Sequence, residues 1–189
     1  MTEFDAINRM LRYLGELPIP NDVAIDDLPE GHEAVMARII LEETSREEQE
    51  ERWWFNKFTT TYVPNDSGYI TLPDNVISLT SDTKYLKDGN DLYDVDNQTK
   101  IFETGVELSV IVERAFSDLP DTFQTYVVLV AAKHLHVYLN GDETTQKELE
   151  RRLSIQRIKL EKENMRQNKY NLMSGARLLD RGSNPTALI

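Results

Sequence analysis

The stretch SDLPDTFQTYVVLVAAKHLHVYLNG, residues 117–141, is the most uniformly apolar helical segment of the chain. Apolar residues recur at helical spacing from Phe123 to Tyr138, and Asp121 is a candidate N-terminal cap. Gly141 ends the pattern. A helix without a polar face must be covered on several sides. The stretch therefore predicts the central helix of a bundle.

Helical patterns also occur on both sides of this segment. Apolar residues at three- and four-residue steps predict a short helix capped by Thr2 and stopped by Gly15. A second, longer helix is expected from about His32 through the string EETSREEQEER, which is made of good helix formers. After the central segment, a further helix is expected from near Thr144 to about Asn168.

Short runs of β-branched and aromatic residues separate the second helix from the central one. The turn residues at 64–68 predict a hairpin, and the short links between runs favour antiparallel pairing. We predict an α+β fold with about four helices. Residues 1–53 and 117–171 are expected to form the helical bundle, residues 54–116 an antiparallel β module inserted between helices two and three, and residues 172–189 a flexible extension.

Three consecutive aromatic residues lie where the helical pattern gives way to strands, in the string REEQEERWWFN at residues 46–56. Trp53, Trp54 and Phe55 are candidates for the seam between the two modules. Stacking of the tryptophans on sugar rings is an alternative, but burial is the commoner fate of aromatic side chains.

Charge is distributed unevenly along the chain, which has 21 Lys+Arg against 33 Asp+Glu and a formal charge of −12. Residues 145–189 carry ten basic and five acidic residues (10 − 5 = +5), and the first 144 residues carry eleven and 28 (11 − 28 = −17). This acidity argues against an ordinary nucleic-acid binder. An acidic body with a basic C-terminal arm suits head-to-tail docking of copies or docking on an acidic partner, although a solvated face explains the same charges.

Two further compositional features limit the possible classes. The absence of cysteine excludes disulfides, thiolate metal sites and cysteine nucleophiles. We expect neither a signal peptide nor a membrane span, because no long apolar run occurs.

The residue types that carry catalysis or bind metals occur without the necessary spacing. His134 and His136 are two residues apart, which places them on different sides of a helix. Residues 88–97, DGNDLYDVDN, are rich in oxygen ligands, but Tyr93 and Thr99 stand where a calcium loop needs glycine and glutamate. A turn between two strands explains that segment better. We therefore predict no catalytic residue, no cofactor and no metal site.

Several strings, in this order, resemble the tail tubular protein A family, the adaptor or head-to-tail connector of short-tailed bacteriophages. They are AINRMLRYLGELPI, RWWFN, YITLPDNVISL, DGNDLYDVDNQT, DLPDTFQTYVVLVAAKHL and YNLM. The resemblance covers nearly the whole chain. It implies a structural protein of the virion tail, made in the host cytoplasm and without enzymatic activity.

The resemblance also implies a set of partners. Family members form a twelvefold ring that contacts the portal protein above and the nozzle protein, tail tubular protein B, below. The ring surrounds the channel through which double-stranded DNA leaves. In such adaptors the C-terminal extension commonly reaches onto the portal, which makes residues 174–189 the candidate docking tail, with Arg177, Leu178, Leu179 and Arg181 as its candidate contacts.

A channel for DNA should not bind the duplex tightly, and acidic residues on its wall repel phosphates. Under the resemblance, Glu43, Glu47, Glu50 and Glu51 are the candidate channel lining. The alternative is that they form only the solvated outer face of a helix.

Two other functions remain open from the sequence alone. A tail-associated polysaccharide or peptidoglycan hydrolase needs a pair of carboxylates at a fixed separation, which cannot be recognised among 33 acidic residues. A cellular helical scaffold fits the composition but not the ordered set of strings.

Overall fold

The structure, a computed structural model, describes the backbone of residues 1–79, 84–139 and 141–180, and side chains as far as residue 169. The helices are α1 (Glu3–Tyr13), α2 (Glu33–Glu48), α3 (Asp121–Tyr138) and α4 (Glu143–Asp180). The strands are β1 (Lys57–Tyr62), β2 (Val76–Leu79), β3 (Tyr85–Asp88), β4 (Asp91–Asp94) and β5 (Val106–Val112). Among the described residues, four α-helices and small antiparallel sheets confirm the predicted α+β class. No helix within the described ranges is long and apolar enough to span a bilayer.

Helix α1 begins and ends where the sequence predicts. The Thr2 hydroxyl accepts a hydrogen bond from the Asp5 amide at 3.1 Å, and the Asp5 carboxylate accepts one from the Thr2 amide at 3.3 Å. This reciprocal pair is a capping box. Gly15 follows the helix with a φ of +80°, a conformation that glycine adopts at low cost.

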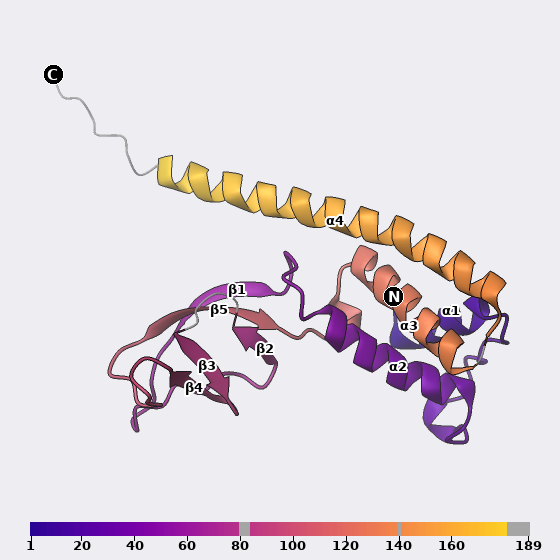
Figure 1. The fold of residues 1–189 in the computed structure, drawn as a ribbon, viewed down its shortest axis with the longest axis horizontal. Helices are drawn as coiled ribbons and strands as arrows, with labels where there is room; N and C mark the ends of the chain where they lie inside the picture. The colour runs from indigo at the N-terminus through magenta and orange to yellow at the C-terminus, as the bar shows by residue number, and fades with distance from the viewer. Residues whose placement is uncertain (80–83, 140, 181–189) are drawn as a thin grey trace.

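Helix α3 is the central helix of the bundle, as predicted. It packs against α1, α2 and α4 (Figure 1), and most of its residues are buried. The prediction that Asp121 caps this helix is wrong. Pro120 occupies the cap position, and its carbonyl accepts the first helical hydrogen bond from the Gln124 amide at 2.9 Å. Asp121 is the first residue inside the helix.

The hairpin prediction around residues 64–68 is wrong about which strands pair. The turn itself forms, since the Gly68 amide donates to the Asn65 carbonyl at 2.8 Å. However, β1 pairs along its whole length with β5, and the sheet order is β1-β5-β2. The chain beyond the turn instead bonds to the β4 region, where the Leu92 amide donates to the Ile70 carbonyl at 2.9 Å. Burial of Ile70 draws that segment into the sheet core and away from β1.

The acidic segment 88–97 forms turns, as predicted. Strands β3 and β4 pair antiparallel, with Asp88 opposite Asp91. Gly89, the first of the two residues between them, has a φ of +66°, as in the glycine-first turns that favour two-residue hairpins.

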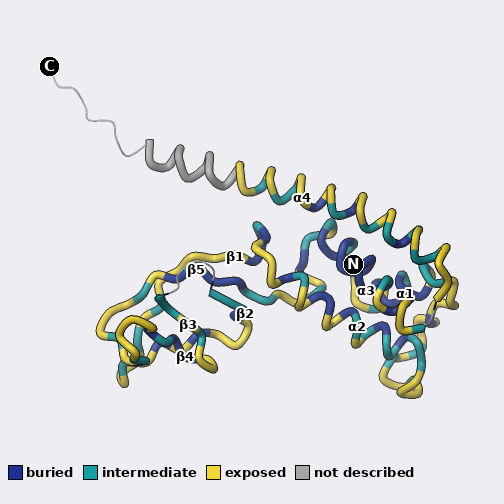
Figure 2. Tube along the Cα trace, in the orientation of Figure 1, coloured by how far each residue is buried: buried dark blue, intermediate teal, exposed yellow. Residues whose placement is uncertain are grey.

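Two separate groups of buried apolar side chains hold the fold together, one between the helices and one under the sheets (Figure 2). The bundle group includes Ile7, Leu41, Phe123, Leu135 and Leu160. The sheet group consists of Ile70, Leu72, Val76, Leu92, Leu108 and Val110. Figure 1 shows the strands beside the bundle, with α4 running along one side of the molecule.

Helix α4 is longer than its sequence predicts. The expected end near Asn168 is wrong, because the helical backbone continues to Asp180. No proline interrupts residues 143–180, so backbone hydrogen bonding can continue beyond the bundle. Leu160 is the last buried residue among the described side chains of this helix.

Candidate functional site at the junction of helices and strands

Residues 49–56, the passage from α2 to β1, are held in place by hydrogen bonds to side chains. Helix α2 ends at Glu48, earlier than predicted, and Gln49 is its C-cap. The buried Asn56 side chain accepts from the Trp53 amide at 3.0 Å and donates to the Gln49 carbonyl at 2.6 Å. The Trp53 indole donates to the Glu48 carbonyl at 2.8 Å. These bonds satisfy backbone groups that the end of a helix leaves unpaired.

The three consecutive aromatics pack with the helices. Trp53, which is 2% exposed, and Phe55 lie in the bundle core, and both meet the Phe123 ring edge-on, at centroid distances of 5.4 and 4.9 Å. Trp54 is partly buried, and its amide donates to the Asn164 side chain of α4 at 3.1 Å. The aromatic run therefore closes the bundle core immediately before the chain enters β1.

The chain leaving the strands is joined to the same passage. The Gln49 side chain accepts from the Arg114 amide at 2.8 Å and donates to the Arg114 carbonyl at 3.1 Å. Beside it, the Val112 amide donates to the Asn56 carbonyl at 2.9 Å. The two segments that connect strands and helices are thus held together by paired polar contacts.

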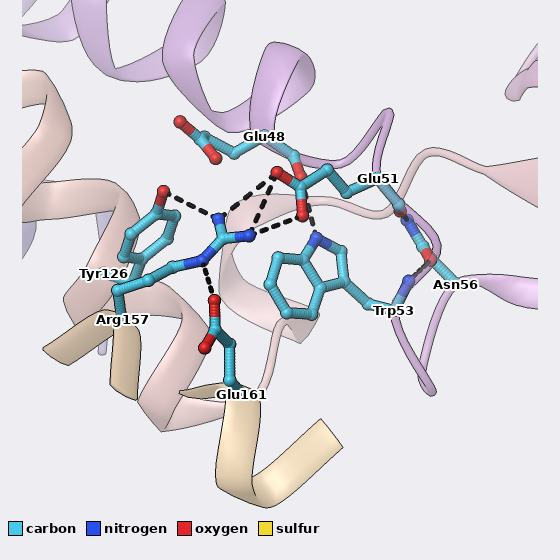
Figure 3. A network of polar contacts seen from close by, with 7 residues as sticks. All are labelled: Glu48, Glu51, Trp53, Asn56, Tyr126, Arg157 and Glu161. Atoms are coloured by element: carbon cyan, nitrogen blue, oxygen red, sulfur yellow. Dashed lines mark hydrogen bonds and ion pairs between the residues drawn. The ribbon is translucent and has the colours of Figure 1, made fainter. Parts of the chain in front are cut away.

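Arg157 of α4 is the centre of the polar network in Figure 3. Its guanidinium contacts the Glu51 carboxylate at 2.8 Å and the Glu161 carboxylate at 2.9 Å, and it donates to the Tyr126 hydroxyl at 3.0 Å. It also lies over the Trp53 ring, 5.1 Å from the centroid. Burial opposes its charge, but the hydrogen bonds to Glu51 and Glu161 outweigh that effect and raise the pKa of Arg157.

The four glutamates predicted to line a channel lie in two different environments. Glu43, Glu47 and Glu50 are exposed, and their spacing places them on one side of α2 and of the residues that follow it. Glu51 is also exposed, but Arg157 compensates its charge. Sequence reasoning missed Arg157, since its partners are up to 106 positions away and nothing in the local pattern of α4 signals them.

Glu48 faces the same network, and burial raises the pKa of its carboxyl above the ordinary 4.5, while hydrogen bonding to Tyr126 opposes the shift. The folded state therefore binds this proton more tightly than the unfolded state. The resulting cost in stability of the folded protein is absent below pH 4.5 and grows as pH rises through the folded pKa.

We expect Glu48→Gln to raise the free energy of unfolding at pH 7, with no gain at pH 4, in urea unfolding at both pH values. Glu47→Gln, at an exposed position, is the control, and an equal gain at both pH values would contradict the prediction.

The two histidines of α3 serve separate contacts. His134 lies 3.4 Å from the Thr44 hydroxyl, and the buried His136 ring lies 2.8 Å from the Asp142 carbonyl. Among the residues described, no group of three or more His, Asp or Glu side chains is arranged to hold a metal ion.

The predicted portal-docking residues lie at and beyond the end of α4. The backbone at Arg177, Leu178 and Leu179 belongs to this helix, and their side chains are outside the described part of the structure. Arg181 lies outside the described residues altogether.

Comparison with known proteins connects this architecture to a family. Residues 4–170 match the family described as tail tubular protein. The chain is also 33% identical over 144 residues to tail tubular protein A of Klebsiella phage KP34, an alignment that covers 74% of this chain and 73% of that protein. The family match includes α2, α3, the strands and the junction between them, nearly all of α1, and α4 as far as residue 170. This chain therefore belongs to the tail tubular protein family, and it is a structural component of a bacteriophage tail.

Proposed function

We propose that copies of this chain form the adaptor ring of a short phage tail. Twelve copies would join the portal protein to the nozzle protein, tail tubular protein B, and would surround the channel through which DNA is ejected. The family assignment supports a tail component, and the length of α4 is the observation that carries the adaptor role. The backbone of this helix continues to Asp180, 20 residues beyond Leu160, its last described buried residue, which gives it the length to reach a neighbouring protein.

The ring would need a wall that lets DNA slide. We propose that Glu43, Glu47 and Glu50, exposed together on one side, contribute to this wall, because fixed negative charges repel phosphates. Glu51 contributes less, since Arg157 offsets its charge. Coordinates of an assembled ring that placed all of these carboxylates on its outer surface would contradict this assignment.

We also propose that Trp53, Trp54 and Phe55 form the seam between the helical and strand modules. Their rings stabilise the bundle core, and the residue after them, Asn56, is bonded to the end of β5. A load passed between the modules in the assembled tail would cross this segment.

Removing all residues after Asn171 is the first test of the adaptor role. We expect the truncated protein to melt within a few degrees of the full chain, because the last described buried residue of α4 is Leu160. Its affinity for the assembled cognate portal should fall about tenfold or more, equivalent to about 1.4 kcal/mol or more. Co-sedimentation with the portal measures the affinity, and calorimetry controls for the fold. Full-strength portal binding by a normally folded truncation would contradict the proposed docking tail.

The proposed role involves no chemical reaction. The hydrolase alternative rests on the many acidic residues and on tryptophans that could stack on sugars, but the Trp53 ring is buried against Phe123 and shielded by Arg157. Turnover of a polysaccharide or peptidoglycan by the purified protein, abolished by replacing one defined pair of carboxylates, would reverse this part of the proposal.

A further inference from the structure

The outward face of α4 carries a stripe of apolar and basic side chains. The stripe consists of Ile155, Ile158, Lys162, Met165 and Lys169, which follow one another at alternating steps of three and four residues. All five are exposed, and Met165 is 64% exposed. They lie on the side of the helix turned away from its buried residues, and no helix or strand in the described part of the chain covers them. We call this surface the α4 stripe.

The apolar residues of the α4 stripe are not explained by a need to keep the helix surface soluble. Exposed helix faces are usually filled with charged and polar residues, whereas three of these five positions are large and apolar. Neither Lys162 nor Lys169 forms an ion pair within the described part of the chain, although neighbouring arginines of α4 do. The stripe therefore offers an apolar strip with unpaired positive charge, which suits an acidic partner surface that also projects an apolar side chain.

The same chain carries such a surface in the connection between α1 and α2. Residues 16–30 contain five acidic residues and no lysine or arginine. Of these, Asp26 is paired with Arg38, and the other four form no ion pair among the described residues. Leu17, at one end of the segment, is 88% exposed. We call residues 16–30 the acidic loop.

The acidic loop is held in a defined conformation. The Asn8 side chain accepts from the Ile19 amide at 2.6 Å and donates to the Ile19 carbonyl at 3.2 Å, and Ile19 is buried in the bundle core. Pro18 and Pro20 further restrict the backbone around it. Leu17 thus projects from a fixed support, so little conformational entropy would be lost when it docks.

We propose that the α4 stripe of one copy docks on the acidic loop of the next copy, with Leu17 seated among Ile155, Ile158 and Met165 and the two lysines facing the loop carboxylates. This pairing rests on the proposed ring. In a ring of identical copies each interface joins two different surfaces of the same chain. The stripe and the loop are complementary both in charge and in apolar contact, as heterologous docking requires.

Paired charge reversals test this contact. Variant one is Lys162→Glu with Lys169→Glu, and variant two is Asp22→Lys with Asp27→Lys. Each variant alone places like charges across the proposed interface, so its self-association and its ring formation on the cognate portal should weaken about tenfold or more. In an equimolar mixture, both variants can alternate around the ring with opposite charges at every contact, and assembly should recover. Lys57→Glu, which reverses an exposed lysine on β1 that forms no ion pair among the described residues, is the control and should assemble normally.

A cross-linking experiment examines the same contact directly, because the chain contains no cysteine. Leu17→Cys combined with Ile158→Cys should give a ladder of disulfide-linked oligomers on the portal, whereas Leu86→Cys with Ile158→Cys should not. Sedimentation velocity and electron microscopy follow assembly, and gels without reductant follow cross-linking.

The outcomes separate this inference from the function on which it rests. The docking contact is overturned, and the adaptor role left intact, if wild type forms rings and both charge-reversed variants form them equally well. The same conclusion follows if the Leu17→Cys, Ile158→Cys variant forms rings but gives no ladder of cross-linked oligomers. Charge-reversed stripe variants that lose portal binding but keep contacts between copies would assign the stripe to the portal instead. A wild-type protein that forms no ring on its portal overturns both proposals.

Discussion

Phe123→Ala should lower the free energy of unfolding by about 3–5 kcal/mol, the usual cost of removing a fully buried phenylalanine side chain. Phe123 is 0% exposed and lies at the centre of the aromatic group, with the Trp53 ring 5.4 Å and the Phe55 ring 4.9 Å away. Both neighbours come from the passage between α2 and β1. The cavity left by the missing ring would therefore loosen the bundle where the segment between α2 and β1 packs against it. A domain of ordinary stability would lose a large part of its free energy of unfolding.

Urea unfolding followed by tryptophan fluorescence measures this loss, since Trp53 and Trp54 lie in the affected region. Phe58→Ala is the matched control. Phe58 is 47% exposed on β1, so its removal should change the free energy of unfolding by less than about 1 kcal/mol. Similar losses for the two variants would show that the aromatic group is not the centre of the bundle core.

The second largest effect is expected at Arg157. Arg157→Ala should destabilise the protein by about 2 kcal/mol, because several modest contributions are lost together. Each partly exposed ion pair, to Glu51 and to Glu161, contributes no more than about 1 kcal/mol, and the cation–π contact over the Trp53 ring adds about 0.5–1 kcal/mol. Loss of the guanidinium also leaves Glu51 beside the half-buried Glu48 without compensation.

Comparison with other substitutions isolates the network. Arg157→Lys should recover less than half of the loss, because an ammonium group cannot contact Glu51, Glu161 and Tyr126 in the planar geometry of Figure 3. Arg151→Ala, at an exposed arginine of the same helix, should cost less than about 0.5 kcal/mol. A double-mutant cycle of Arg157→Ala with Glu51→Gln that gave no coupling energy would contradict a direct role for the pair.

The sequence predicts those parts of the fold that depend on local patterns. The capped start of α1, the central position of α3 and the β3–β4 turn each follow from residues that are close in the chain, such as Thr2 with Asp5. The strand order does not. The turn at 64–68 is a valid local signal, but the pairing of β1 with β5 depends on burial across more than 40 residues.

The same distinction applies to the candidate site. Trp53 and Phe55 could be identified as buried aromatics from their type alone, but their contact with Phe123 could not. Arg157 reads as one of many basic residues on α4, and only the fold brings it to Glu51 and Tyr126. The sequence predicts too early an end for α4, because the last residues of the chain combine Gly, Ser, Asn and Pro with scattered Leu, a composition typical of a loose tail.

The adaptor role is tested most directly by electron microscopy of the full-length protein mixed with its assembled cognate portal. We expect a closed ring of twelve copies bound at one end of the portal, with the exposed carboxylates of Glu43, Glu47 and Glu50 turned toward the central channel. A portal that remains bare at saturating protein, or that carries scattered copies without a closed ring, would contradict the adaptor role.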